Sequence, residues 1–81
     1  MRYRFASNQM RRIFEELYMN GSVRISNPNK RLVGALRLLE RRLKEKGYDF
    51  DVIYDPYKRE LIVFSYNIYK VGSSYVYFSK F

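Results

Sequence analysis

Apolar residues recur along this chain with two different periods, and the change of period separates helices from strands. Between Asn27 and Gly47 they recur every three or four positions, as in a helix with one buried face. The apolar stripe consists of Leu32, Val33, Leu36, Leu39 and Leu43. Asn27 is a favourable N-cap, Pro28 suits the first helical position, and Gly47 can close the last turn in a left-handed conformation. The pattern predicts a long helix over 27–47.

A second helical pattern precedes this one, over Asn8–Met19. Ser7 is placed to cap its start, and Gly21 is placed to end it. Its apolar stripe consists of Met10, Ile13, Phe14, Leu17 and Tyr18. On either side, Met1–Phe5 and Ser22–Ser26 alternate between apolar and polar residues, which indicates short strands.

After Gly47 the period changes to two. Three segments rich in aromatic and β-branched residues are expected to be strands, namely Tyr48–Asp55, Glu60–Tyr69 and Tyr75–Phe81. Their short connections permit only antiparallel neighbours. We therefore predict a single α+β domain over 1–81, of order (β)α(β)αβββ, with two helices packed on a C-terminal three-stranded antiparallel β-meander.

The charge of the chain points to an acidic partner. Sixteen Lys and Arg against eight Asp and Glu give a formal net charge of +8. Such an excess favours polyanions, so DNA or RNA is the expected partner, and an acidic protein surface or a protein–RNA complex is the alternative. The sequence has no apolar run of the roughly 18 residues that a span needs and no signal-peptide core at its start, so we expect no membrane and a cytoplasmic location, in a host if the protein is viral.

The helix over 27–47 carries the main candidate site. The face roughly opposite the apolar stripe carries Lys30, Arg37, Arg41 and Lys44, and Gly34 lies among them, where a glycine permits close approach of a partner. The predicted binding residues are Lys30, Arg31, Gly34, Arg37, Arg41 and Lys44, assisted by Arg11, Arg12, Lys58 and Arg59. The alternative is a solvated face on which Glu40 and Glu45 pair with these cations.

The sequence offers little chemistry for catalysis. It contains no His and no Cys, and it has no glycine-rich phosphate loop, so we expect no enzyme activity, no metal and no cofactor. Asp49, Asp51 and Asp55 are expected to be solvated or paired with Arg. Four tyrosines of the predicted sheet either stack on bases or fill the core, namely Tyr66, Tyr69, Tyr75 and Tyr77.

These patterns favour a small, basic, non-enzymatic nucleic-acid-binding protein. The alternative is a phage or mobile-element accessory protein that inhibits a host nucleic-acid-processing complex, of the anti-defence or anti-CRISPR type. This chain is similar to such proteins in size and charge alone. A toxin-type ribonuclease without His and a winged helix remain further alternatives, by layout only. The last strand is also a candidate edge for homodimerisation.

Overall fold

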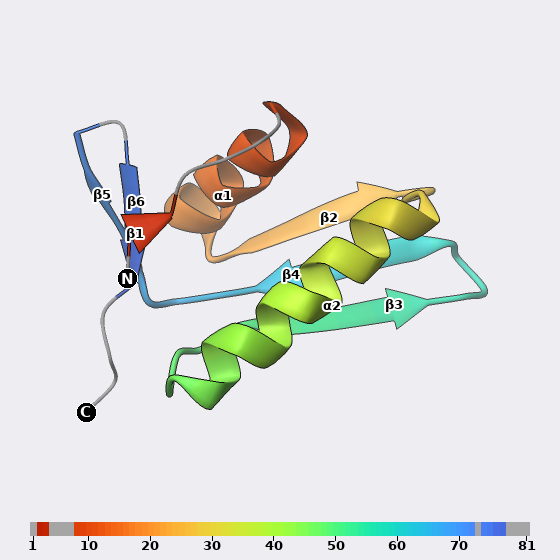
Figure 1. The fold of residues 1–81 in the computed structure, drawn as a ribbon. Coiled ribbons are helices and arrows are strands. Elements are labelled where there is room, and N and C mark those ends of the chain that lie inside the picture. The colour runs from red at the N-terminus through yellow and green to blue at the C-terminus, as the bar shows by residue number, and fades with distance from the viewer. Residues whose placement is uncertain (1, 4–7, 73, 78–81) are drawn as a thin grey trace.

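The fold is α+β, as predicted. The computed structural model describes residues 2–3, 8–72 and 74–77 (Figure 1). Along the chain its elements are β1 (Arg2–Tyr3), α1 (Asn8–Asn20), β2 (Ser22–Ser26), α2 (Lys30–Glu45), β3 (Asp51–Asp55), β4 (Glu60–Phe64), β5 (Ile68–Val71) and β6 (Ser74–Tyr77). The remaining parts of the predicted terminal strands, and the proposed cap Ser7, lie outside the described residues.

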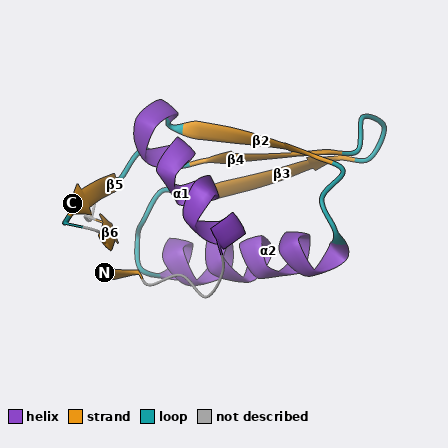
Figure 2. Ribbon diagram, turned by 90° about the horizontal axis from the view of Figure 1, so that it is seen from above, coloured by secondary structure: helices purple, strands orange, loops and turns teal. Residues whose placement is uncertain are grey.

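The main sheet has three antiparallel strands in the order β2-β4-β3. Helix α2 lies across one face of it (Figures 1 and 2). Val63 in the central strand pairs with Val23 on one side and Val52 on the other. The predicted leucines of α2 are buried against this face, namely Leu32, Leu36, Leu39 and Leu43. Apolar residues at helical spacing therefore meet apolar residues at strand spacing, which forms the two-layer core.

A second, smaller sheet has the order β1-β6-β5, and α1 contacts both β2 and β5. The aromatic ring of Phe14 on α1 joins the two parts of the core. Its centroid lies 6.2 Å from that of Phe50 and 6.1 Å from that of Tyr75. Such ring separations are typical of packed aromatic pairs. Helix α1 buries Ile13, Phe14 and Leu17, and Phe14 is the ring that contacts aromatic residues of both parts.

The strands are distributed differently from the prediction. The expected meander of 48–55, 60–69 and 75–81 in one sheet is wrong in its pairing, because β4 ends at Phe64 and the chain leaves the sheet. β5 and β6 pair with each other instead. The third strand of the main sheet is β2, which the sequence indicated only as a short isolated strand.

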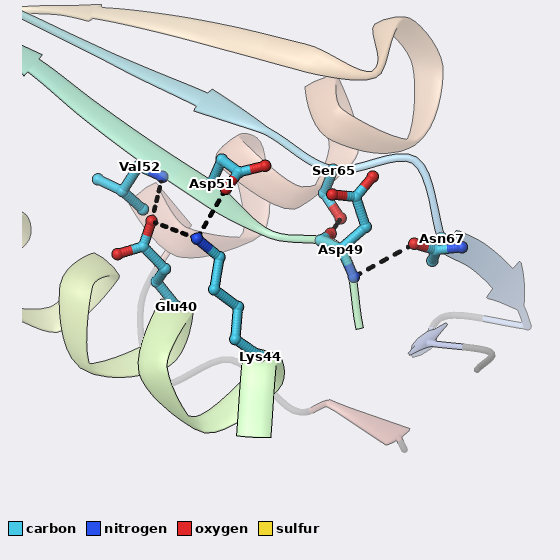
Figure 3. A network of polar contacts seen from close by, with 7 residues as sticks. All are labelled: Glu40, Lys44, Asp49, Asp51, Val52, Ser65 and Asn67. Carbon is cyan, nitrogen blue, oxygen red and sulfur yellow. Dashed lines mark hydrogen bonds and ion pairs between the residues drawn. The ribbon is translucent and has the colours of Figure 1, made fainter. Parts of the chain in front are cut away.

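Polar residues cause this break at 65–67. The side chains of Leu61, Val63 and Ser65 are buried, one at every second position. The next buried residue is Ile68, three positions later, so the alternation of the strand is interrupted. The Ser65 hydroxyl donates to the Asp49 carbonyl at 2.6 Å, and the Asp49 N–H donates to Asn67 Oδ1 at 3.2 Å (Figure 3). These side-chain bonds replace ladder bonds with the neighbouring strand, so the strand stops.

The start of α2 also differs from the prediction. The N-cap is Asn29 and not Asn27, because the Asn29 side chain accepts a 2.7 Å hydrogen bond from the N–H of Leu32. Asn27 instead has a φ of 50°, and its N–H donates to the Arg59 carbonyl. Pro28 then lies before the cap and keeps this linker extended. Asn27 and Asn29 are both good caps by residue type, and the register with the leucine stripe decides between them.

The end of α2 agrees with the prediction. Gly47 has a φ of 83°, its N–H bonds to the Lys44 carbonyl, and the N–H of Tyr48 bonds to the Leu43 carbonyl. This pair of bonds is the Schellman arrangement, which requires a left-handed residue. Between its ends α2 runs through Gly34 without a break. The division into two helices that a winged helix needs is therefore missing from the described chain.

Candidate functional site

The outer face of α2 carries a group of free cations. This basic face comprises five exposed residues, namely Lys30, Arg31, Arg37, Arg41 and Arg42. None of them forms an ion pair with another residue in the part of the chain that the structure describes. At a rise of about 1.5 Å per residue they extend over roughly 18 Å of helix. The intrahelical pairing expected from Glu40 and Glu45 does not neutralise them.

Lys44 has a different role from the other cations of α2. Its ammonium lies 2.7 Å from Asp51 Oδ1 and 3.6 Å from Glu40 Oε2 (Figure 3). The hydrogen bond to Asp51 raises the pKa of Lys44 above its ordinary value. The charge of Lys44 is therefore used to attach α2 to β3, and the basic face depends on the remaining cations.

Glu40 completes this contact between helix and sheet. Its Oε2 accepts a 2.6 Å hydrogen bond from the backbone N–H of Val52, on the edge strand β3 (Figure 3). An unpaired N–H on a sheet edge is open to pairing with another chain. The carboxylate thus satisfies this group and holds α2 at a fixed angle, with its cations turned away from the sheet.

Two apolar residues interrupt the basic face. A Cβ added at Gly34 would have no atom within 4 Å apart from its own helix and neighbours, so packing does not require a glycine there. Leu38 lies one turn further on and is 47% exposed. Together they form a small apolar strip between the cations, at which a partner could approach the helix backbone.

The other predicted cations lie apart from the basic face. Arg11 and Arg12 are on α1, where Arg12 lines a shallow groove with Glu16 and Arg24 of β2. Arg11 lies near Tyr75, whose pKa is raised by burial and lowered in part by this charge. The structure therefore does not bring the α1 cations into one site with α2.

Lys58 and Arg59 lie in the β3–β4 turn, at the end of the molecule where α2 begins (Figures 1 and 2). The backbone bond from Asn27 to Arg59 ties this turn to the linker that precedes α2. The same turn presents Tyr57, which is 97% exposed. Sequence analysis overlooked Tyr57, although an aromatic between Pro56 and two cations in a turn was a usable signal.

The four candidate tyrosines differ in their exposure to solvent. Tyr75 is buried in the core, whereas Tyr66 and Tyr69 are exposed. The Tyr66 ring lies over Gly21, so close that a Cβ there would approach its Cε1 to 2.9 Å. The side chain of Tyr77 lies outside the described part. The exposed tyrosines therefore do not form one platform with the basic face.

Acidic residues gather on the opposite side of the molecule. No described helix or strand covers the second face of the main sheet (Figure 2). By register, Asp55 and Glu60 point to this face, where Glu60 pairs with Arg24 at 3.1 Å, whereas the Asp51 carboxylate turns to Lys44 of α2. Within the described residues, no three His, Cys, Asp or Glu side chains are grouped to hold a metal ion. The open face thus carries charges of both signs, with Arg24 beside Glu60.

Comparisons with known proteins do not add to this picture. The chain matches no known family model, and searches of curated proteins and of solved structures found nothing similar. Among the described helices, none is long and apolar enough to cross a membrane. The functional argument therefore depends on the residues themselves.

Proposed function

We propose that the protein is a small, non-enzymatic nucleic-acid-binding protein that contacts phosphates through the basic face of α2. The observation that supports this function is that five exposed cations lie on one helix with no described ion-pair partner. Phosphate binding releases condensed counterions and favours such clusters of Lys and Arg. Arginine adds bidentate hydrogen bonds to phosphate oxygens, and four of the five cations are arginines.

The charge distribution supports the same proposal. The net charge of +8 attracts a polyanion at long range, and the five cations of the basic face are the part of that charge on α2 with no described ion-pair partner. Lys58 and Arg59 extend the positive surface past the start of α2. Arg11 and Arg12 contribute to the overall field from α1 rather than to direct contacts.

The direct test is binding of labelled DNA and RNA, single-stranded and duplex, by fluorescence anisotropy. Arg37→Glu/Arg41→Glu should abolish binding and leave the thermal unfolding temperature nearly unchanged, because both side chains are exposed. The matched control is Arg11→Glu/Arg12→Glu, which makes the same change of net charge on exposed residues of α1 and should retain most of the binding. Full binding by the α2 variant would refute the proposed interface.

A second candidate is an inhibitor, of the anti-defence type, that binds an acidic surface on a host nucleic-acid-processing protein. The observation that favours it is Leu38, an exposed apolar side chain among the cations. A leucine side chain does not strengthen binding to phosphates, whereas a protein interface buries apolar residues within a polar rim. Gly34 beside it would let such a partner approach closely.

Leu38→Ser distinguishes the two candidates. If the partner is nucleic acid alone, this variant should bind it within about twofold of the original affinity. If the partner is a protein, Leu38→Ser should weaken capture of that protein from nuclease-treated host lysate by about tenfold, because a buried leucine contributes about 1.5 kcal/mol or more. Arg37→Lys is the matched control, since it keeps both the charge and Leu38.

A further inference from the structure

The tip of the β3–β4 turn presents an aromatic ring that the fold does not use. Tyr57 is 97% exposed, and the described residues provide it with no ring contact. An aromatic side chain contributes to stability mainly by burying its large apolar surface. Since Tyr57 buries almost none, its ring is available to a ligand on both faces.

The tip holds this ring on a fixed backbone. Asp55 Oδ1 accepts hydrogen bonds from the N–H groups of Tyr57 at 2.9 Å and Lys58 at 3.3 Å. These bonds form a local Asx-type turn. At the other side of the turn, the Asn27 N–H donates to the Arg59 carbonyl at 2.8 Å. The turn is thus anchored twice, and a ligand that binds there orders little additional backbone.

The tip also places an arginine where the backbone conformation disfavours any residue with a side chain. Arg59 has a φ of 50°, in the left-handed region where glycine is favoured. Residues in this strained conformation are enriched at functional sites. Arg59 and Lys58 place two exposed positive charges directly after the exposed ring.

The position of the tip relates it to the basic face. The turn projects at the same end of the molecule as the first turn of α2, which carries Lys30 and Arg31 (Figures 1 and 2). An aromatic ring beside cations is the combination with which proteins bind single strands, because bases stack on the ring and phosphates pair with the charges. A base within a duplex is already stacked and does not offer its face.

We propose that Tyr57 stacks on an unpaired nucleobase of single-stranded nucleic acid, while Lys58 and Arg59 contact the phosphates beside that base. The strand then continues to Lys30 and Arg31 at the start of α2. This inference rests on the proposed function and adds a preference for single strands to it. Because stacking involves the base and the proposed function involves the phosphates, the two proposals can be tested separately.

The test compares two ligands of equal charge, a short labelled oligothymidine and an oligomer of the same length without bases. The original protein should bind the oligothymidine about 5- to 100-fold more tightly, as expected for one stacked base. Tyr57→Ala should lose this preference but bind the abasic oligomer as before. Tyr57→Phe is the matched control, because it keeps the ring and should keep the preference. Oligouridine in place of oligothymidine distinguishes RNA from DNA.

Each outcome separates the inference from the function on which it rests. If Tyr57→Ala keeps the full preference for the base-bearing oligomer, the stacking role is refuted. Arg37→Glu/Arg41→Glu would then still report on phosphate binding through α2. If the original protein binds duplex DNA but neither oligomer, the inference fails and the proposed function stands, whereas binding to no nucleic acid of either kind refutes both proposals. Because the Tyr57 side chain is exposed, an unchanged unfolding temperature in Tyr57→Ala shows that the fold is intact.

Discussion

Single asparagines and glycines decide where α2 begins and ends. The sequence pattern predicted Asn27 as the cap, although Asn29 is of the same residue type. Asn29 caps the helix, whereas Asn27 takes a left-handed conformation in the preceding linker. This choice depends on which register places Leu32 and Leu36 against the sheet. It is a tertiary constraint that the local pattern does not contain.

Asn29→Ala should lower the free energy of unfolding by about 1 kcal/mol, because the N–H of Leu32 loses its side-chain acceptor. In a domain of this size that corresponds to a fall of about 4–8 °C in the unfolding temperature. Asn27→Gly is the control and should be neutral or slightly stabilising, since glycine tolerates the observed φ. If Asn27→Gly lowered the stability more than Asn29→Ala, the cap would be Asn27.

Replacement by alanine should have opposite effects on stability at Gly34 and at Gly47. Gly34→Ala should raise the free energy of unfolding by about 1 kcal/mol, because alanine is the better helix former and its Cβ meets no atom within 4 Å. Gly47→Ala should lower it by about 1 kcal/mol or more, because its φ of 83° suits only glycine. Chemical denaturation of both variants measures this difference.

If Gly34 serves a partner, Gly34→Ala should also weaken binding to that partner while it stabilises the fold. A variant that is more stable and binds equally well would show that the glycine has no role in recognition.

At the scale of elements, the helices and most of the strands could be predicted, but the pairing of strands could not. Alternation places Phe50, Val52 and Tyr54 on the core side of β3, as observed. The break after Phe64 was overlooked, although polar Ser65 and Asn67 occupied the inward phase. Their partner is the backbone of Asp49, which lies 16 and 18 residues away. The polar residues could be seen in the sequence, but their hydrogen-bond partner could not, because a contact so distant in sequence leaves no periodic pattern.

The attachment of α2 to β3 depends on Glu40. Glu40→Ala should lower the free energy of unfolding by roughly 1.5–3 kcal/mol, because the N–H of Val52 loses a charged acceptor. Hydrogen exchange of the Val52 amide should become faster in this variant. Glu45→Ala is the matched control, as it removes the same charge from an exposed position on the same helix. Equal stability of the two variants would contradict the structural role of Glu40.

At the scale of the whole molecule, the leucine stripe decides where the cations of α2 lie. The stripe faces the sheet, so the cations opposite it face outward, whereas Lys44, nearer the sheet, pairs with Asp51. Sequence analysis found the cations of α2 but not their separation from Arg11 and Arg12, because that depends on the placement of α1. It also counted Lys44 with the basic face, although Asp51 on another element pairs with it.

The most direct measurement of the central claim is the salt dependence of binding to duplex DNA. The slope of log affinity against log salt concentration is about −0.9 for each phosphate contact. Arg37→Gln/Arg41→Gln should therefore make the slope less steep by about 2, whereas Arg11→Gln/Arg12→Gln, which removes the same charge from α1, should leave it nearly unchanged. Equal slopes for the two variants, or an affinity of the original protein that does not depend on salt, would contradict the assignment of α2 as the phosphate-binding surface.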